Sequence, residues 1–217
     1  MTSIVKIFTS SVGKKLVMSL TGIFLLSFLV VHLTGNFLLF KNDGGVAFDV
    51  YAEFMSTNPL IRTMEIVLAL GFLFHIISGV IVWLQNRKAR PKKYSVNKIS
   101  ENTKLASRIT MLTGSVVFFF LVVHLKTFWV GSRLAPTKIS MYELVVTAFS
   151  SPTYVGFYVV SLVFLAYHLR HGFQSAFQTL GIRVEPYGRL IEAIGIIFWL
   201  VIPVGFAIMP IYFLWYR

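Results

Sequence analysis

The chain has 217 residues, of which 56% are hydrophobic and only 13% are charged, with a formal net charge of +12 and no cysteine. This composition excludes an ordinary soluble domain, whose surface would need more polar residues. The lack of cysteine excludes disulfides, cysteine-ligated zinc and any iron–sulfur cluster held by this chain.

Five stretches without Asp, Glu, Lys or Arg predict the secondary structure. About 20 apolar residues of helix cross a bilayer core, and each stretch reaches that length directly, with an uncharged extension or with some tilt. The predicted helices are, in chain order, 16–40, 61–84, 109–131, 153–177 and 191–214. We therefore expect an all-α integral membrane protein in which residues 1–217 form a single domain of five transmembrane helices.

The distribution of basic residues predicts the topology. Cytoplasmic loops carry an excess of Lys and Arg. With the N-terminus inside, the inner segments hold 14 basic residues and the outer segments hold six. We expect the N-terminus inside and the C-terminus outside. The basic stretch at 85–108 is explained by topology and by anionic membrane lipid, so no nucleic-acid partner is expected.

A repeat relates the first four predicted helices. The sequence FLVVHL occurs at Phe28–Leu33 and Phe120–Leu125, and Leu-Thr-Gly precedes both copies, at an offset of 92 residues. The next helices share a proline, a histidine and a glycine at an offset of 93: Pro59 and Pro152, His75 and His168, Gly79 and Gly172. The chain reads as a duplicated helix pair followed by a fifth helix without a counterpart.

The repeat places four histidines at two depths. With a rise of about 1.5 Å per residue, His32 and His124 fall in the outer half of the membrane, and His75 and His168 in the inner half, about 15 Å away. Intramembrane ionisable residues are costly and usually functional. Two imidazoles from different helices are what a hexacoordinate haem iron requires, with axial nitrogens about 4 Å apart. We expect two haems, which transfer electrons because both axial positions are filled.

Roles without haem account less well for these histidines. A buried histidine can be bonded to Ser, Thr or a backbone carbonyl, but four in two depth-matched pairs favour haem. Zinc or copper would need more ligands within reach, and a proton relay would need a carboxylate in mid-span. A haem-free transporter or channel would need polar groups along a path and usually broken helices.

Three glycines and a fifth histidine accompany the four. Gly79 and Gly172 each lie four residues after their histidine, on the same helix face. They either leave room for a haem ring or permit close helix packing, and Gly35, three residues after His32, offers the same choice. His171 breaks the repeat: it is an interfacial group, near a haem propionate, or it replaces His168 as ligand.

Five helices, four histidines on the first four of them, basic inner loops and no cysteine resemble the two-haem cytochrome b membrane anchor of succinate dehydrogenases and fumarate reductases. The stretch HLRHGFQSAFQTLGI at His168–Ile182 is similar to the end of that family's fourth helix. The resemblance implies that His75 and His168 hold the haem b near the cytoplasmic partners. His32 and His124 would hold the haem b near the outer face.

The resemblance also implies partners and location. A flavoprotein and an iron–sulfur subunit would lie on the cytoplasmic side of a bacterial cytoplasmic membrane. This chain would pass electrons through its haems to or from a quinone, with menaquinone typical of the two-haem form. Succinate chemistry would belong to the complex, and the resemblance allows for dimers of complexes. A cytochrome b subunit of a hydrogenase or formate dehydrogenase is the alternative, but histidine spacings of 43, 49 and 44 favour the succinate family.

The quinone site has three candidate residues. A quinone head group needs a hydrogen-bond donor or a carboxylate near a haem edge at the membrane border. Arg62 and Glu65 lie at the outer start of the second helix, and Glu53 lies in the preceding loop. Each of them would serve equally well as an interfacial ion or a topological anchor.

Overall fold

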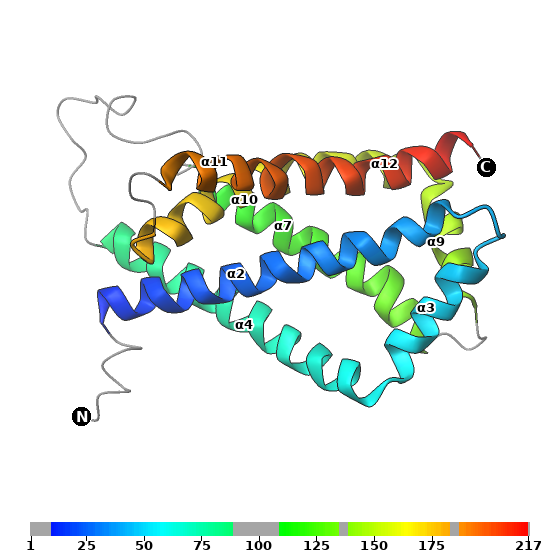
Figure 1. Ribbon diagram of the computed structural model, residues 1–217, viewed down its shortest axis with the longest axis horizontal. Coiled ribbons are helices and arrows are strands. Elements are labelled where there is room, and N and C mark those ends of the chain that lie inside the picture. Colours follow the sequence, from blue (N-terminus) through cyan, green and yellow to red (C-terminus); the bar gives the residue numbers. More distant parts are fainter. Residues whose placement is uncertain (1–9, 89–108, 135–138, 183–186, 217) are drawn as a thin grey trace.

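The computed structural model describes residues 10–88, 109–134, 139–182 and 187–216, and these are helical apart from short connections (Figure 1). The first half comprises α2 (Ser11–Asn36), the 3₁₀ turn η1 (Phe37–Phe40), α3 (Val46–Thr57) and α4 (Pro59–Lys88). The second half comprises α7 (Thr110–His124), the π-helix η2 (Leu125–Val130), α8 (Gly131–Leu134), α9 (Met141–Phe149) and α10 (Pro152–Thr179). The chain ends with α11 (Gly188–Ile196), the π-helix η3 (Ile197–Val201) and α12 (Ile202–Trp215).

The described part of the chain contains five helical segments that are long and apolar enough to cross a membrane. They are Val12–Phe40, Pro59–Lys88, Thr110–Leu134, Pro152–Thr179 and Gly188–Trp215. The prediction of five spans is confirmed. The segments run a few residues further than predicted, because charged residues such as Arg87 and Lys88 continue the last turn of α4, where long basic side chains can reach the interface.

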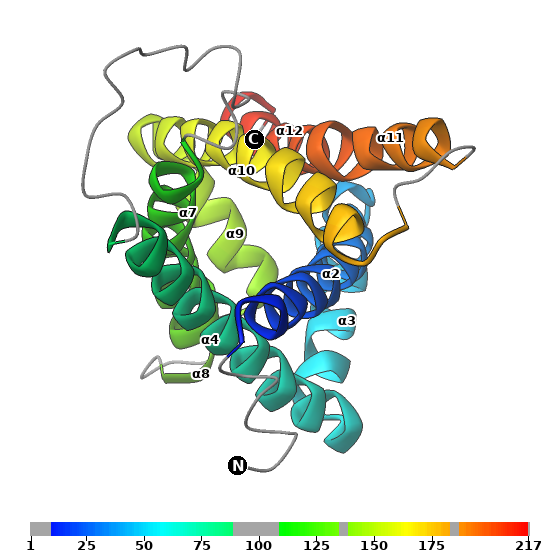
Figure 2. The ribbon, with the colours of Figure 1, turned by 90° about the vertical axis from the view of Figure 1, so that its left-hand side faces the viewer.

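The two halves pack as helix pairs. α2 lies along α4, and α7 lies along α10, while α10 also packs on α2. Seen end-on, α2, α4, α7 and α10 surround the bundle axis, and α11–α12 lies outside α10 and α2 (Figure 2). α4 diverges from α2 towards the end where α3 lies (Figure 1). The fifth span therefore covers one side of the four-helix arrangement.

The short helices α3 and α9 extend the repeat beyond the membrane spans. They pack against each other at one end of the bundle, and the Tyr142 backbone N–H donates to Asp49 Oδ1 over 2.8 Å. These two residues are themselves 93 apart. In a two-fold pair, equivalent residues touch each other only near the axis. The contact therefore marks a pseudo-two-fold axis that runs between the two halves.

One π-helix explains an irregularity of the repeat. The offset is 92 up to Leu125 and 93 from Pro152 onward. A π-turn is a one-residue insertion into an α-helix, and η2 begins directly after His124. η2 therefore accounts for the change of offset and rotates the end of this span relative to its counterpart in α2.

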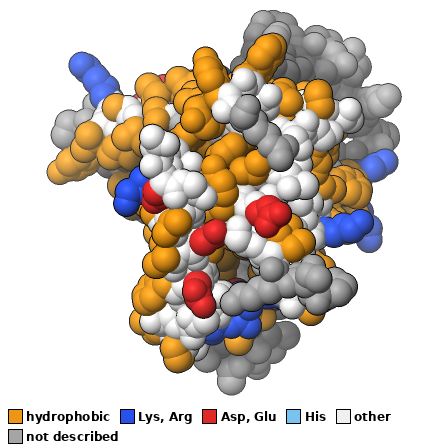
Figure 3. Space-filling model, turned by 90° about the vertical axis from the view of Figure 1, so that its right-hand side faces the viewer, with side chains coloured by type: hydrophobic (Ala, Val, Ile, Leu, Met, Phe, Trp, Pro, Cys, Tyr) orange, Lys and Arg blue, Asp and Glu red, His pale blue; other side chains and the backbone are white. Residues whose placement is uncertain are grey.

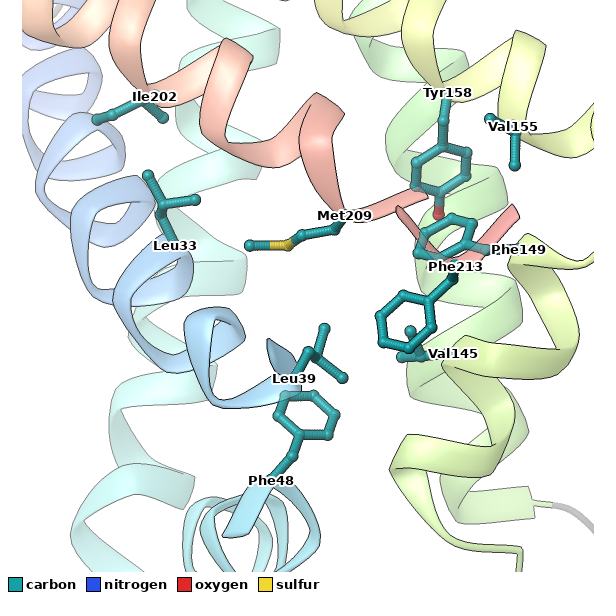
Figure 4. Close-up of a cluster of buried hydrophobic side chains, with 10 residues drawn as sticks. All are labelled: Leu33, Leu39, Phe48, Val145, Phe149, Val155, Tyr158, Ile202, Met209 and Phe213. Atoms are coloured by element: carbon teal, nitrogen blue, oxygen red, sulfur yellow. The ribbon is translucent and has the colours of Figure 1, made fainter. Parts of the chain in front are cut away.

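Two apolar clusters form the core. The larger lies towards the α3 and α9 end, where α12 meets α2, α9 and α10 (Figure 4); its buried members are Leu33, Leu39, Phe48, Val145, Phe149, Val155, Tyr158, Ile202, Met209 and Phe213. The second joins α2, α10 and α11 through Leu26, Leu162, Leu165, Leu169, Phe173 and Ile191. Both clusters include buried residues of the fifth span. In α4 the buried residue is Gly71, so this helix contributes no buried side chain to either cluster.

Candidate functional site

The histidine pair that the sequence predicts to be the outer one joins α2 to the end of α7. The ring centres of His32 and His124 are 5.8 Å apart, and the rings are nearly perpendicular at 89°. Aromatic rings surround the pair at centre distances of 5.2 to 5.7 Å: Phe28 and Phe206 on His32, Phe120 and Phe128 on His124. The two imidazoles thus face each other in an apolar environment.

The inner pair joins α4 to α10 in the same manner. The ring centres of His75 and His168 are 6.3 Å apart, at an interplanar angle of 80°. Like the outer pair, these histidines occupy equivalent positions of the repeat, so both pairs lie close to the pseudo-two-fold axis. The structure brings together the two pairs that helix depth predicted.

Both pairs have the spacing that two axial haem ligands need. Axial nitrogens about 4 Å apart, each about 1 Å from its own ring centre, give ring centres about 6 Å apart. The observed 5.8 and 6.3 Å fit this value. Among the described residues, no group of three or more His, Cys, Asp or Glu could hold a metal ion. Two histidines per pair would supply the two axial ligands of an iron whose remaining ligands come from a macrocycle.

Two threonines hold the inner histidines. Nδ1 of His75 lies 3.2 Å from Thr21 Oγ1, and Nδ1 of His168 lies 3.4 Å from Thr113 Oγ1. Each hydroxyl donates its own hydrogen to a backbone carbonyl of its helix, over 2.8 Å for Thr21 and 3.0 Å for Thr113. The hydroxyl must then accept from the imidazole, so Nδ1 carries the hydrogen and Nε2 keeps its lone pair for a metal.

The glycine of each Leu-Thr-Gly motif completes this arrangement. A Cβ placed on Gly22 would lie 3.5 Å from Cε1 of His75, and one on Gly114 would lie 3.4 Å from Cε1 of His168. Both distances are ordinary van der Waals contacts, so each imidazole ring lies directly against the glycine of the neighbouring helix. In the sequence, the Leu-Thr-Gly motif indicates only a repeat. In the structure, its threonine and its glycine contact the inner histidines.

The outer histidines have different partners from each other. His124 Nδ1 lies 3.1 Å from the hydroxyl of Tyr158 on α10. Asn36 Nδ2 lies 3.4 Å from Nδ1 of His32 but donates to the His32 carbonyl over 2.7 Å. The amide group therefore gives His32 no acceptor comparable to the phenol that faces His124.

The three glycines singled out in the sequence differ in what lies next to them. A Cβ on Gly79 would lie 3.2 Å from Cε of Met18, so this glycine permits close packing of α2 on α4, while a Cβ on Gly172 would meet nothing within 4 Å in the described part of the chain. A Cβ on Gly35 would lie 2.5 Å from the Tyr51 hydroxyl. Gly35 therefore accommodates a tyrosine of α3, whose burial raises the pKa of its hydroxyl above the ordinary value.

His171 lies apart from the inner pair. The ring that faces His75 is that of His168, and His171 lies three residues further along α10. Arg170, between them, places its guanidinium 5.1 Å from the ring centre of Trp199 in η3. The geometry favours His168 over His171 as the partner of His75.

A charged cluster lies at the N-terminal end of α4, the end that the sequence predicts to be outer. The carboxylate of Glu65 accepts from Arg62 over 2.5 Å, from Arg133 over 3.1 Å and from the indole of Trp129 over 2.6 Å. The Glu65 side chain remains 29% exposed. Of the three predicted quinone residues, the structure thus brings together Arg62 and Glu65, whereas Glu53 is exposed on α3 without a contact to this cluster.

Trp129 and Arg133 were not among the predicted site residues. They lie near the C-terminal end of the third span, and Glu65 lies near the start of the second. The matched depth that the sequence predicts for these two ends is the signal that points to them. Their side-chain direction depends on η2 and α8, which a plain α-helical reading does not include.

The comparisons with known proteins bear on this geometry. No protein-family model matches the chain, and no solved structure matches it. A curated relative, the succinate dehydrogenase cytochrome b558 subunit of Bacillus subtilis (strain 168), is 26% identical over 172 residues, which cover 79% of this chain and 78% of the relative. The chain is similar to a succinate dehydrogenase cytochrome b subunit. The resemblance inferred from the sequence is confirmed.

The matched region includes most of the candidate site. A stretch of 172 residues within 217 begins no later than residue 46 and ends no earlier than residue 172. It therefore contains His75, His124 and His168, together with Glu65 and Tyr158. The similarity covers both halves of the repeat, not one helix pair.

Proposed function

We propose that this chain is the haem-containing membrane anchor of a succinate dehydrogenase or fumarate reductase complex. It relays electrons between an iron–sulfur subunit and a membrane quinone. The observation that carries the proposal is the pair of facing histidines at each of two levels, with ring centres 5.8 and 6.3 Å apart. The similarity to a succinate dehydrogenase cytochrome b558 subunit supports it independently.

Each pair would supply both axial ligands of one haem b. His75 and His168 would hold the inner haem, and His32 and His124 the outer haem, and the haems supply one-electron transfer when bound. The protein's part is to present unprotonated Nε2 atoms and to exclude water. Thr21 and Gly22 act on His75 as their repeat counterparts act on His168, and the aromatic rings around the outer pair keep its surroundings apolar.

Charge supports an orientation with the N-terminus inside. Lys14, Arg87 and Lys88 lie at the end of the bundle where α2 begins and α4 finishes. The opposite end, formed by α3, α9 and the turn before α3, carries acidic side chains among hydrophobic ones (Figure 3); Asp43, Glu53 and Glu143 lie in these segments. The basic end would face the cytoplasm of a bacterial cell and dock the flavoprotein and iron–sulfur subunits.

The Glu65 cluster would form the quinone site. It would lie in the outer half of the membrane with the His32–His124 pair, and its carboxylate is partly exposed. Oxidation of a quinol releases two electrons and two protons. Glu65 would take a proton from the quinol hydroxyl, while Arg133 and Trp129 would orient the carboxylate. Menaquinone is the substrate proposed, in line with the two-haem arrangement.

Haem content tests the proposal. The purified chain should bind two haem b, measured by pyridine haemochrome and by the reduced-minus-oxidised spectrum. H32A and H124A should each lose one haem, and the double variant H32A/H124A should lose no more than one. H75A and H168A should each lose the other haem, and the double variant H75A/H168A should lose no more than that one. H171A, a matched histidine on the same helix as His168, should keep both haems.

Two results would contradict the proposal. A folded protein without haem would remove the electron-transfer role and favour a haem-free transporter. Loss of both haems in every single variant would contradict the assignment of ligands to two separate pairs. Flavin and iron–sulfur subunits that co-purify with the chain and oxidise succinate would distinguish this complex from another respiratory dehydrogenase.

A further inference from the structure

A line of hydroxyl groups leads away from His124. Nδ1 of His124 lies 3.1 Å from the hydroxyl oxygen of Tyr158, and this oxygen lies 3.2 Å from that of Tyr154. The Tyr154 hydroxyl in turn donates to Thr127 Oγ1 over 2.8 Å. Tyr158 is only 5% exposed and belongs to the buried cluster with Phe149 (Figure 4). The three side chains come from α10 and η2, so the line crosses from one helix to another and back.

The hydrogens along this line run in one direction. If Nε2 of His124 binds iron, Nδ1 carries the hydrogen and donates to Tyr158. Tyr158 can then donate to Tyr154, and Tyr154 to Thr127, so that each phenol accepts one bond and donates one. Hydrogen bonds in such a chain polarise each other, more strongly in a low-dielectric interior than in water. The line therefore makes Tyr158 a better acceptor than an isolated phenol.

No other histidine of the four has this arrangement in the part of the chain that the structure describes. The threonines that face His75 and His168 donate to backbone carbonyls of their own helices, so each of these two histidines is followed by a single side-chain hydroxyl. The amide of Asn36 donates to the carbonyl of His32. The difference arises at η2, which begins directly after His124 and contains Thr127.

We propose that Thr127, Tyr154 and Tyr158 are positioning residues that fix the tautomer of His124 and lower the reduction potential of the outer haem. An acceptor on Nδ1–H makes the imidazole a stronger base, and a stronger donor stabilises ferric over ferrous iron. The inference rests on the proposed haem function, and it assigns to His124 a chain of three hydroxyls where His75 and His168 each face one.

Redox titration of Y158F and Y154F tests this inference. Y158F removes the acceptor, so the equilibrium between the reduced and oxidised outer haem should shift about tenfold towards the reduced form, which is about 59 mV for a one-electron couple. The inner haem should not change. Y154F keeps the direct contact but shortens the chain, so it should shift the outer haem less, in the same direction. The outer haem is identified as the one that H32A removes.

A matched control and a second readout separate tuning from packing. Tyr212 lies near the outer end of α12, where its ring stacks on Tyr216, and Y212F should leave both potentials unchanged. Infrared difference spectra with ring-deuterated tyrosine should show a phenol band that shifts when the outer haem is reduced. This band should be absent in Y158F and present in Y212F.

Each outcome decides the inference. If wild-type protein lacks two haems, the proposed function fails, whatever the tyrosines do. If Y158F keeps two haems at unchanged potentials, the inference is overturned although the function stands. If Y158F loses the outer haem, the redox titration of Y154F decides. A higher potential of the outer haem in Y154F supports the chain of hydroxyl groups, and an unchanged potential overturns the inference.

Discussion

Glu65 and Tyr158 occupy equivalent positions of the two halves, 93 residues apart, yet they have opposite surroundings. The Glu65 side chain is 29% exposed and is bound by three donors from α4, η2 and α8. Tyr158 is 5% exposed and lies in one cluster with Met209 and Phe213 of α12. The fifth span packs on α10 and α2 and covers Tyr158, so the same position is a partly exposed carboxylate in one half and a buried phenol in the other.

The threonines that face the inner histidines should be needed to retain the inner haem. T21V and T113V keep the side-chain shape but remove the acceptor for Nδ1–H. Loss of such an outer contact typically lowers the affinity of a metal site about 10- to 100-fold. Haem occupancy at limiting haem supply measures the effect. T34V is the matched control, because Thr34 also donates to a carbonyl of α2; equal haem loss in T34V would contradict the prediction.

Replacing Glu65 should separate quinone chemistry from haem binding. E65Q keeps the size of the side chain but removes its charge and its basicity, so electron transfer between quinol and the haems should slow by about 10²- to 10⁴-fold. Haem content should remain at the wild-type level. Stopped-flow reduction of the haems by a quinol analogue measures the rate. E53Q, on the exposed face of α3, should behave as wild type, and an equally slow E53Q would show that Glu65 is not the specific group.

The contact on the pseudo-two-fold axis should contribute to stability. D49A removes the acceptor of the Tyr142 N–H, so the free energy of unfolding should fall by about 1 to 2 kcal/mol. D49N, which keeps a carbonyl oxygen in place, should lose less. Thermal unfolding in detergent, followed by circular dichroism, compares these variants with E143A on the exposed face of α9. A similar loss in E143A and D49A would contradict a specific role for the contact.

Gly35 and Tyr51 should be coupled. A Cβ on Gly35 would overlap the Tyr51 ring, so G35A should destabilise the protein by about 1 to 3 kcal/mol through overpacking. In the double variant G35A/Y51A the added methyl group no longer meets the ring. The two losses should therefore not add, and a double-mutant cycle on unfolding free energies measures the difference. Additive losses would mean that the two residues do not interact.

Some features of this molecule could be predicted from the sequence because they depend on regular quantities. Five uncharged stretches predicted five spans, and a constant rise per residue put His32 at the depth of His124. Other features depend on helix rotation, which the sequence does not determine. The change of offset from 92 to 93 is visible in the sequence, but its position in η2 is not. As a result, the contact of His124 with Tyr158 and that of Trp129 with Glu65 were missed.

The threonine contacts were missed for a different reason. Thr21 and Thr113 were recognised as repeated residues, but each meets a histidine on the neighbouring helix, more than 50 residues away. Repetition identifies equivalent positions without showing what they touch. Glu53 was predicted as a third quinone residue because it precedes the second helix; the structure places it on an exposed face of α3.

The position of the fifth span also constrains how such complexes could associate in the membrane. Glu65 lies on α4, on the opposite side of the bundle from α11–α12 (Figure 2). α4 presents exposed apolar side chains along its length, among them Ile66, Leu70, Leu73 and Ile77. A neighbouring complex bound to this face would block the lateral approach of a lipid-dissolved substrate. A dimer formed through α11 and α12 would leave that approach open on both protomers, at opposite edges of the assembly.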